Sequence, residues 1–382
     1  MKLNLSDICE YAKGKIAVAD LNEDCYISTE NMLPNKSGIT SATSLPKTSQ
    51  TQSFQAGDIL VSNIRPYFKK IWFAEFDGGC SNDVLVFRAK KGISSSYLYY
   101  VLANDEFFDY AMKTSNGTKM PRGDKKAIMK YEVEQMDFDT QKKSAVTLRS
   151  IDQKIALNTA INENLEQQAQ AIFKSWFVDF EPFGGVMPDD WKTSHLLSVA
   201  NYLNGLAMQK YRPIDGEIGL PVLKIKELRQ GFCDSNSELC SPSIKSEYII
   251  QNGDVIFSWS GSLLVDFWCG GQCGLNQHLF KVTSNTYDKW FYFVWTKYHL
   301  NRFIAIAADM ATTMGHIKRS ELEKSQVFIP NKADYKIIGS LLKPIYDTII
   351  NNRIENQRLA ALRDTLLPKL MNGEIDVSKV RI

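Results

Sequence analysis

The chain has 382 residues, a net charge of +2 at neutral pH and seven cysteines. Its length favours two or three domains, and its nearly balanced charge does not by itself indicate a nucleic-acid partner, so basic patches must be sought one by one. No apolar run is long enough to cross a bilayer, and no signal-peptide core opens the chain. The irregular spacing of the cysteines favours reduced thiols over disulfides. We therefore expect a cytoplasmic protein.

The first segment, residues 1–138, mixes short apolar strands with turns. Strands are expected at 58–63, 70–76 and 83–89, where apolar residues are bounded by Gly, Asn or Asp. Residues 95–113 then show the apolar spacing of a helix. The segment is therefore predicted to be an α+β domain.

A long helix is predicted over residues 139–185. Positions at alternating spacings of four and three form a mostly apolar seam without Pro or Gly, as in a coiled coil. The seam residues are Ile151, Ile155, Asn158, Asn162, Leu165, Ala169, Ile172 and Trp176. Pro and Gly in the following stretch, 182–191, indicate a linker.

The second globular segment, residues 186–332, repeats the order of the first. Strands are expected at 221–228, 254–260 and 278–283, and a helix at 289–308. A C-terminal long helix and tail occupy 333–382, and Pro368 is expected to end the helix seam.

The seam recurs in this last segment, because adding 194 to each position gives a matching set. The matching residues are Ile345, Ile349, Asn352, Asn356, Leu359, Arg363, Leu366 and Leu370. A buried Asn costs stability but fixes register and partner. We therefore predict that the two helices pack antiparallel, with Asn158 near Asn356 and Asn162 near Asn352. The alternative is two unrelated surface helices that both carry Asn.

Self-similarity extends into the globular segments. Residues 57–60 match 253–256 at an offset of 196, and Arg122 matches Arg319 at an offset of 197. The offsets drift but the order does not change, as expected for a duplicated unit of globular domain followed by long helix.

Enzymatic and metal-binding signatures were sought in the same sequence. It contains no phosphate-binding loop of the G-x-x-x-x-G-K-[ST] type and no Pro-Pro pair, and the adjacent acids of 188–192 do not fit a nuclease core. The spacings of Cys233, Cys240, Cys269 and Cys273 are poor for zinc. His278 and His316 have no nucleophile and carboxylate at a recognisable spacing. We therefore expect no catalytic residue and no metal.

The two halves share polar, basic loops after the domain helix, at 113–126 and 309–321. A second cluster lies at 62–70, and its counterpart at 258–266 carries Ser, Trp and Gly in place of the cations. Such loops suit hydrogen bonds to phosphates and base edges, although a solvated loop is the plainer alternative for any one of them. The candidate DNA-binding residues are Arg65, Lys69, Lys119, Arg122, Ser260, Gln277, His316, Lys318 and Arg319.

An aromatic cluster closes the first long helix. Trp176, Phe177 and Phe180 are expected to bind protein partners, together with the outer side of the helix pair.

The chain resembles the DNA-specificity subunit of type I restriction-modification systems. The likeness is carried by 170–183 (QAIFKSWFVDFEPF), 117–124 (GTKMPRGD), 312–320 (TTMGHIKRS) and 358–375 (RLAALRDTLLPKLMNGEI). The resemblance implies an α+β fold in which two similar target-recognition domains are joined by two long antiparallel coiled-coil helices, in a pseudo-two-fold repeat.

The resemblance also implies partners and activity. It implies double-stranded DNA as ligand, each domain reading half of an asymmetric split target, and no catalysis by this chain. Methyltransferase subunits, two of them, would clasp the helices, and an endonuclease or translocase subunit would join for cleavage. S-adenosylmethionine, ATP and Mg²⁺ are expected on those partners and no cofactor on this chain. A non-catalytic protein adaptor without DNA readout is the alternative.

Overall fold

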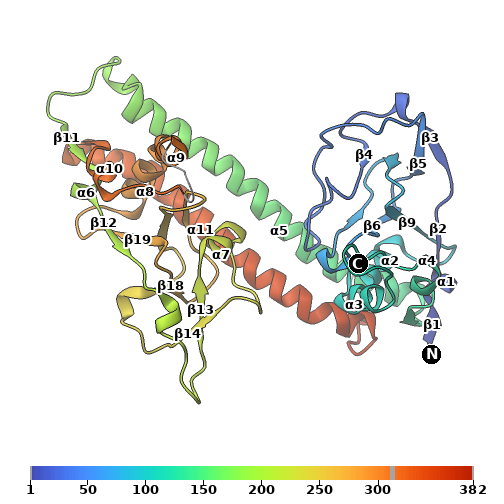
Figure 1. The fold of residues 1–382 in the computed structure, drawn as a ribbon. Helices are drawn as coiled ribbons and strands as arrows, with labels where there is room; N and C mark the ends of the chain where they lie inside the picture. The colour runs from blue at the N-terminus through green and yellow to red at the C-terminus, as the bar shows by residue number, and fades with distance from the viewer. Residues whose placement is uncertain (1, 310–314, 381–382) are drawn as a thin grey trace. The chain divides into compact units, whose positions relative to one another are not determined.

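The computed structural model describes residues 2–309 and 315–380. The chain forms two compact units, each containing helices and sheets (Figure 1). Unit 1 consists of Met1–Gln153 and Ala360–Ile382, and unit 2 of Lys154–Leu359. Each unit therefore includes a part of both long helices, α5 (Phe138–Phe173) and α11 (Lys332–Met371).

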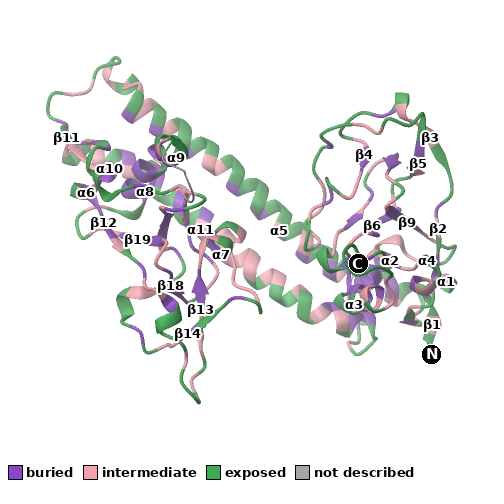
Figure 2. Ribbon diagram, in the orientation of Figure 1, coloured by how far each residue is buried: buried purple, intermediate pink, exposed green. Residues whose placement is uncertain are grey.

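Unit 1 is built on an antiparallel sheet with the strand order β2-β9-β6-β7. The strands are β2 (Cys9–Tyr11), β6 (Ile59–Ser62), β7 (Ile71–Phe73) and β9 (Val84–Ala89). All four residues of β6 are buried (Figure 2), as a strand with neighbours on both sides and cover on both faces requires. The three strands expected from the sequence are thus confirmed as β6, β7 and β9.

A second sheet of unit 1 is absent from the sequence expectations. Its order is β3-β5-β8-β4, and β4 runs parallel to β8. Its strands are β3 (Lys15–Ala17), β4 (Tyr26–Ile27), β5 (Gln50–Phe54) and β8 (Gly78–Cys80). These strands have two to five residues and little alternation, so their apolar pattern is weak. The remaining short elements are β1 (Lys2–Asn4), paired with β10 (Glu132–Glu134), the α-helices α1 (Leu5–Ile8) and α4 (Lys125–Ile128), and the 3-10 helices η1 (Val18–Asp20) and η2 (Pro66–Phe68).

The single helix expected over 95–113 is instead two helices, α2 (Ser95–Ala103) and α3 (Asp105–Lys113). Asn104 separates them with an extended backbone, and its side chain accepts a hydrogen bond from the backbone N–H of Glu106. Asn is a favoured N-cap, so Asn104 ends α2 and starts α3. The apolar spacing of residues 95–113 does not reveal this break.

Unit 2 repeats this architecture. The sheet order β12-β19-β16-β17 matches β2-β9-β6-β7, and in the second sheet β13 runs parallel to β18 as β4 does to β8. The strands are β11 (Lys192–His195), β12 (Asn201–Asn204), β13 (Leu220–Leu223), β14 (Leu239–Cys240), β15 (Ile249–Ile250), β16 (Val255–Ser258), β17 (Leu264–Phe267), β18 (Cys273–Leu275), β19 (Leu279–Thr283) and β20 (Gln326–Ile329).

The helices of unit 2 correct two further expectations. The strand expected at 221–228 ends at Leu223, and Ile225–Gln230 is helix α7, which ends at Gly231 in the left-handed region. The helix expected at 289–308 is α8 (Lys289–Tyr298) followed by α9 (Leu300–Asp309). The other short helices are α6 (Leu196–Val199) and α10 (Arg319–Glu323).

The long helices contact each other within each unit, and every predicted seam residue is buried or half-buried. In unit 2, Asn158 Nδ2 lies 2.9 Å from Asn356 Oδ1, and Asn352 Nδ2 lies 2.9 Å from Asn162 Oδ1. These are the two pairs that antiparallel packing of the two seams predicts. The higher-numbered Asn of α5 pairs with the lower-numbered Asn of α11, so the two segments run in opposite directions there. In unit 1, Arg363 of α11 contacts Asp152 of α5 at 3.0 Å.

A half-buried ion cluster fastens both helices to the sheet of unit 2. Arg353 of α11 contacts Glu166 of α5 at 2.8 Å and Asp266 of β17 at 2.6 Å. Burial alone would lower the pKa of Arg353, but the charges of Asp266 and Glu166 outweigh it and raise that pKa. The guanidinium therefore remains charged and partnered.

The ends of the long helices also differ from expectation. Helix α5 gives way at Lys174 to a π-helical turn that ends at Val178, followed by Phe180 in the left-handed region. Helix α11 does not stop at Pro368 but runs on to Met371, and Gly373, at φ 70°, lies just beyond its end. Among the described residues, no helix combines the length and the apolar character that spanning a membrane requires.

Candidate nucleic-acid interface

The two basic loops predicted in the first half lie against each other in unit 1. Ile64 and Arg122 form a β-bridge, and the backbone N–H of Arg65 donates to the Pro121 carbonyl at 2.8 Å. The N–H of Gly123 donates to the Asn63 carbonyl at 3.2 Å. Residues 62–70 and 113–126 therefore form one surface rather than two.

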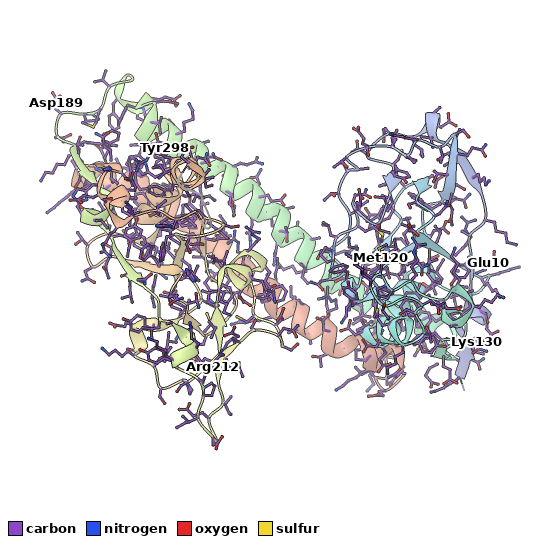
Figure 3. The ribbon with its side chains drawn as sticks, in the orientation of Figure 1. Glu10, Met120, Lys130, Asp189, Arg212 and Tyr298 are labelled. Carbon is purple, nitrogen blue, oxygen red and sulfur yellow. The ribbon has the colours of Figure 1, made fainter. Side chains whose placement is uncertain are left out.

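The second of these loops is closed on itself. Asn116 and Arg122 form a β-bridge with hydrogen bonds of 2.8 and 2.9 Å, and Gly117 takes φ 88° inside the turn. The closed turn leaves Lys119 and Met120 exposed at its tip, where Figure 3 labels Met120. An exposed cation next to an exposed methionine can contact a phosphate and an apolar base edge together.

The cations of this surface are partly neutralised by carboxylates. Arg122 contacts Asp83 at 3.2 Å, and Lys69 shares Asp105 with Lys36, both at 2.8 Å. Burial would raise the pKa of Asp105, but its bonds to the two lysines outweigh this and lower it. Lys69 is therefore held against α3, whereas Arg122 keeps about half of its side chain exposed.

Arg65 is held differently from the other cations. It has φ 50°, an uncommon value for a residue with a side chain, and its Nε is buried without a hydrogen-bond partner. Its guanidinium is therefore partly withdrawn from the surface on which Lys119 and Arg122 lie.

Unit 2 builds the same loop pair from different residues. Ser260 and His316 form a β-bridge, Gly261 N–H donates to the Gly315 carbonyl at 2.8 Å, and Ile317 N–H donates to the Trp259 carbonyl at 3.0 Å. The residues 312–314 of the sequence motif lie outside the described residues. The two loop pairs are equivalent because each joins the end of the central sheet strand, β6 or β16, to the segment before α4 or α10.

This equivalence corrects the sequence alignment of the two halves. The bridge partner of Ile64 is Arg122, and that of Ser260 is His316. The N-caps of the following helices are Asp124 and Lys318, at the same offset of 194. Arg122 therefore corresponds to His316, and Arg319, which the sequence had matched with Arg122, corresponds to Lys125.

The remaining candidates of unit 2 lie around this loop pair. Ser260 is buried and its Oγ lies 3.0 Å from His278 Nδ1, while the amide of Gln277 lies 3.4 Å from His278 Nε2. The structure thus places a hydroxyl, that of Ser260, beside His278, which the spacing in the sequence did not indicate. Among the described residues, however, no carboxylate bonds to His278, so the arrangement lacks the group that orients a catalytic imidazole.

Lys318 and Arg319 are both exposed at the start of α10. Arg319 Nη1 donates to the carbonyl of Tyr202 at 3.3 Å, which ties α10 to β12. Sequence reasoning missed Trp259, whose ring centroid lies 6.3 Å from that of His316 and 6.1 Å from that of His278. The sequence did contain a signal for Trp259, because this aromatic residue lies in segment 258–266, where the cations of segment 62–70 are replaced.

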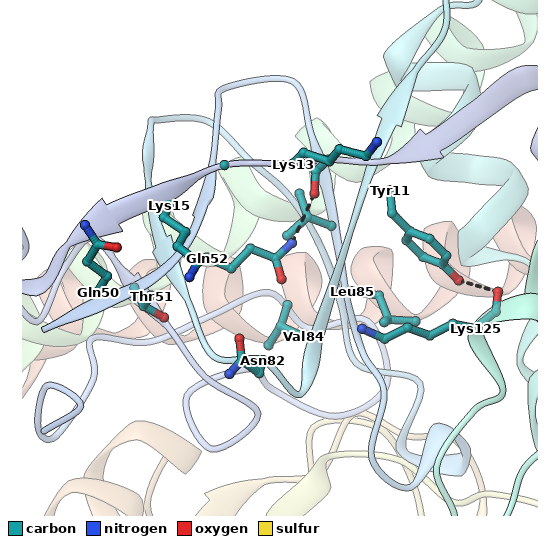
Figure 4. Close-up of a pocket in the computed structure, with 13 residues that line it drawn as sticks. Tyr11, Lys13, Lys15, Gln50, Thr51, Gln52, Asn82, Val84, Leu85 and Lys125 are labelled. Carbon is teal, nitrogen blue, oxygen red and sulfur yellow. Dashed lines mark hydrogen bonds between the residues drawn. The ribbon is translucent and has the colours of Figure 1, made fainter. Parts of the chain in front are cut away.

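An open cavity of about 520 Å³ adjoins the loop pair of unit 1. We call it groove 1 and define it by Lys13, Lys15, Gln50, Gln52, Asn82 and Lys125 (Figure 4). Tyr11 and Gln52 fix its walls, because Tyr11 donates to the Lys125 carbonyl at 3.0 Å and Gln52 to the Ala12 carbonyl at 3.5 Å. Sequence reasoning missed groove 1, since its residues come from four separate segments.

Unit 2 has a cavity of about 540 Å³ next to its own loop pair. We call it groove 2 and define it by Arg212, Lys224, Lys226, Glu238, Gln277 and His278. Arg212, labelled in Figure 3, contacts Glu238 at 3.0 Å, and Lys224 contacts the same carboxylate. Hydrogen bonding and charge from Lys224, then Arg212, lower the pKa of Glu238, so it is ionised at neutral pH.

The structure contradicts part of the predicted partner-binding cluster. Phe177 is fully buried in the core of unit 2, with ring centroids 5.5 Å from Trp191 and 5.4 Å from Trp295. Trp176 and Phe180 are half-buried against Phe183 and Phe328. The π-helical turn explains the error, because it changes the spacing at which side chains face inward.

In the part of the chain that the structure describes, the thiols and acids do not gather into a metal site. No cluster of three His, Cys, Asp or Glu side chains suited to a metal ion occurs among the described residues. Cys233 and Cys273 lie together in one apolar cluster of unit 2. A hydrogen bond from Cys273 lowers the pKa of Cys233, and burial raises that of Cys273.

Comparison with known proteins agrees with this duplicated architecture. A family model described as the type I restriction modification DNA specificity domain matches residues 1–167 and 188–361. The chain is 27% identical over 312 residues to the type I restriction enzyme MjaIX specificity subunit of Methanocaldococcus jannaschii, covering 76% of this chain and 71% of that one. It is 25% identical to the HindI specificity subunit of Haemophilus influenzae, covering 97% and 100%.

The fold is also that of a solved structure. The type I restriction-modification S subunit from M. genitalium superposes with a TM-score of 0.58 at 13% identity, over 97% of this chain and 96% of that one. Because the family model covers most of the sequence and matches it twice, this chain belongs to the type I restriction modification DNA specificity family.

Proposed function

We propose that this chain is the non-catalytic, cytoplasmic DNA-reading subunit of a type I restriction-modification complex, and that each unit reads one half of a split target. One observation carries the proposal: both units present the same bridged loop pair, Ile64 with Arg122 and Ser260 with His316. Base-edge contacts specify a sequence and cations on phosphates position it. Because the side chains of the two pairs differ, the two halves of the target should differ.

The domain and partner assignments belong to the same proposal. Residues 1–138 and 186–332 would be the target-recognition domains, and α5 with α11 an antiparallel coiled coil that binds methyltransferase subunits. Leu157 and Ile161 support this role, since they lie one turn apart on α5 in unit 2 and remain exposed. The other proposed partners are double-stranded DNA and an endonuclease subunit. S-adenosylmethionine, ATP and Mg²⁺ would be bound by the partner subunits.

Methylation mapping tests the proposal directly. Genomic DNA from cells expressing this chain with its methyltransferase subunits should carry one split motif with unlike halves. The double variant Lys119→Ala/Arg122→Ala should relax one half of the motif, and Lys318→Ala/Arg319→Ala the other half. If neither double variant changes the motif or the affinity for DNA, the chain is better described as a protein adaptor.

A further inference from the structure

Groove 1 and groove 2 open at the start of the same strand in the two units but differ in their charge. Groove 1 opens beside Asn82 and Val84, at the start of β9, and groove 2 beside Gln277 and His278, at the start of β19. Strands β9 and β19 have the same position in their sheets. The two cavities share this strand end, whereas the rest of each lining differs: β3 and β5 line groove 1, and the segments next to β13 and β14 line groove 2.

Among the described residues, the lysines of groove 1 have no carboxylate partner. Lys13, Lys15 and Lys125 are exposed, and none of them forms a salt bridge with another residue in the described part of the chain. The acids adjacent in sequence to Asn82 and Lys125 are engaged elsewhere: Asp83 contacts Arg122, and Asp124 accepts hydrogen bonds from two backbone N–H groups of α4. Three positive charges therefore face solvent together.

The cations of groove 2 are neutralised in the same unit. Glu238 contacts both Arg212 and Lys224, and Asp234 contacts Lys226 at 3.1 Å. A cation that already holds a carboxylate gains less from a phosphate, because it must give up the first interaction.

Polar groups suited to DNA line groove 1 between its lysines. Lys15 lies directly across from Gln52 on the paired strands β3 and β5, and Gln50 and Asn82 are exposed at the rim (Figure 4). Lysines bind phosphates, and amides can pair with base edges. Groove 1 is also continuous with the loop pair, since Lys125 follows Arg122 closely and Asn82 precedes Asp83.

We propose that groove 1 binds the phosphate backbone of double-stranded DNA through Lys13, Lys15 and Lys125, and that unit 1 thereby supplies most of the salt-dependent affinity of the whole chain. Unit 2, in which Lys318 and Arg319 are the exposed cations of the loop pair, then depends more on neutral groups, among them Gln277 and the ring of Trp259. This inference rests on the proposed DNA-reading role and adds an unequal division of labour between the two units.

Salt titration of DNA binding tests the division. Fluorescence anisotropy of a labelled random-sequence duplex with the full chain gives the slope of log affinity against log salt concentration. Each phosphate contact contributes about 0.9 to that slope, so Lys13→Ala/Lys15→Ala should reduce its magnitude by about 1.8. Lys13→Arg/Lys15→Arg, which keeps both charges, should retain the wild-type slope.

Two controls make the result specific. Lys91→Ala/Lys142→Ala removes two exposed lysines of unit 1 outside groove 1 and should leave the slope unchanged. Lys224→Ala/Lys226→Ala should reduce it less than the groove 1 variant does. Equal reductions in both units, or an unchanged slope in Lys13→Ala/Lys15→Ala, would overturn this inference while leaving the proposed function intact. A wild-type chain that does not bind the duplex at any salt concentration would overturn both.

Discussion

The amide pair Asn162–Asn352 allows a quantitative test of how the long helices recognise each other. Asn162 is almost fully buried in unit 2, its Oδ1 accepts the bond from Asn352 at 2.9 Å, and its Nδ2 donates to the Ile349 carbonyl at 3.3 Å. The substitution Asn352→Leu removes the donor and leaves a buried oxygen unsatisfied. Such a loss costs about 1–3 kcal/mol.

The double variant should behave differently from the sum of its parts. Replacing both partners with apolar groups removes the unsatisfied atom, so Asn162→Leu/Asn352→Leu should recover most of the stability lost in Asn352→Leu. The resulting coupling free energy should be about 1–2 kcal/mol. The register should become less certain, because two leucines tolerate sliding that paired amides do not.

Tryptophan fluorescence during urea unfolding is a suitable assay. Six of the seven tryptophans, all except Trp72, lie in unit 2, so the signal reports mainly on that unit. A loss of about 2 kcal/mol, with an m-value of about 2 kcal/mol/M, lowers the midpoint by about 1 M. Asn351→Leu, at an exposed neighbouring position, should change the free energy of unfolding by less than about 0.5 kcal/mol. Strictly additive effects in the double variant would refute the coupling.

Three further predictions concern unit 2. Burial lowers the pKa of His299 below its ordinary 6.5, so near that pH the unfolded chain binds more protons than the folded chain. The free energy of unfolding should therefore fall as the pH drops from 7 toward and below 6.5. In urea titrations His299→Gln should weaken this pH dependence, and an unchanged dependence would contradict the prediction. A hydrogen bond from Cys273 lowers the pKa of Cys233, so iodoacetamide should label Cys233 faster than the similarly exposed Cys25. Mass spectrometry of the labelled peptides measures both rates, and Cys273→Ala should remove the difference between them. Phe177→Ala should destabilise unit 2 by about 3–5 kcal/mol in urea unfolding, whereas Val178→Ala, at an exposed neighbour, should cost far less; similar losses would show that Phe177 does not anchor the core.

Features that depend on residues close in sequence, or on exact repetition, could be predicted from the sequence. The strands β6, β7 and β9 follow from their apolar runs, and the partners of Asn158 and Asn162 follow from the repeated seam together with the predicted antiparallel packing. Both signals exist because the side-chain period of an element is a local rule and a buried amide must pair with another polar group. The order of elements in the two halves was determined in the same way.

The tertiary structure decided what depends on contacts between distant segments. Groove 1 collects Lys13, Gln52, Asn82 and Lys125 from separate turns and strand ends, and no periodicity connects them. The correspondence of Arg122 with His316 needed the β-bridges, because insertions shift the offset by a few residues and similar cations nearby mislead an alignment. Phe177 showed the same limit: its aromatic character was evident, but a π-helical turn and the surrounding core determined that it faces inward. A sequence specifies which side chains are available, whereas packing decides which of them share a surface and which charges there remain unpaired.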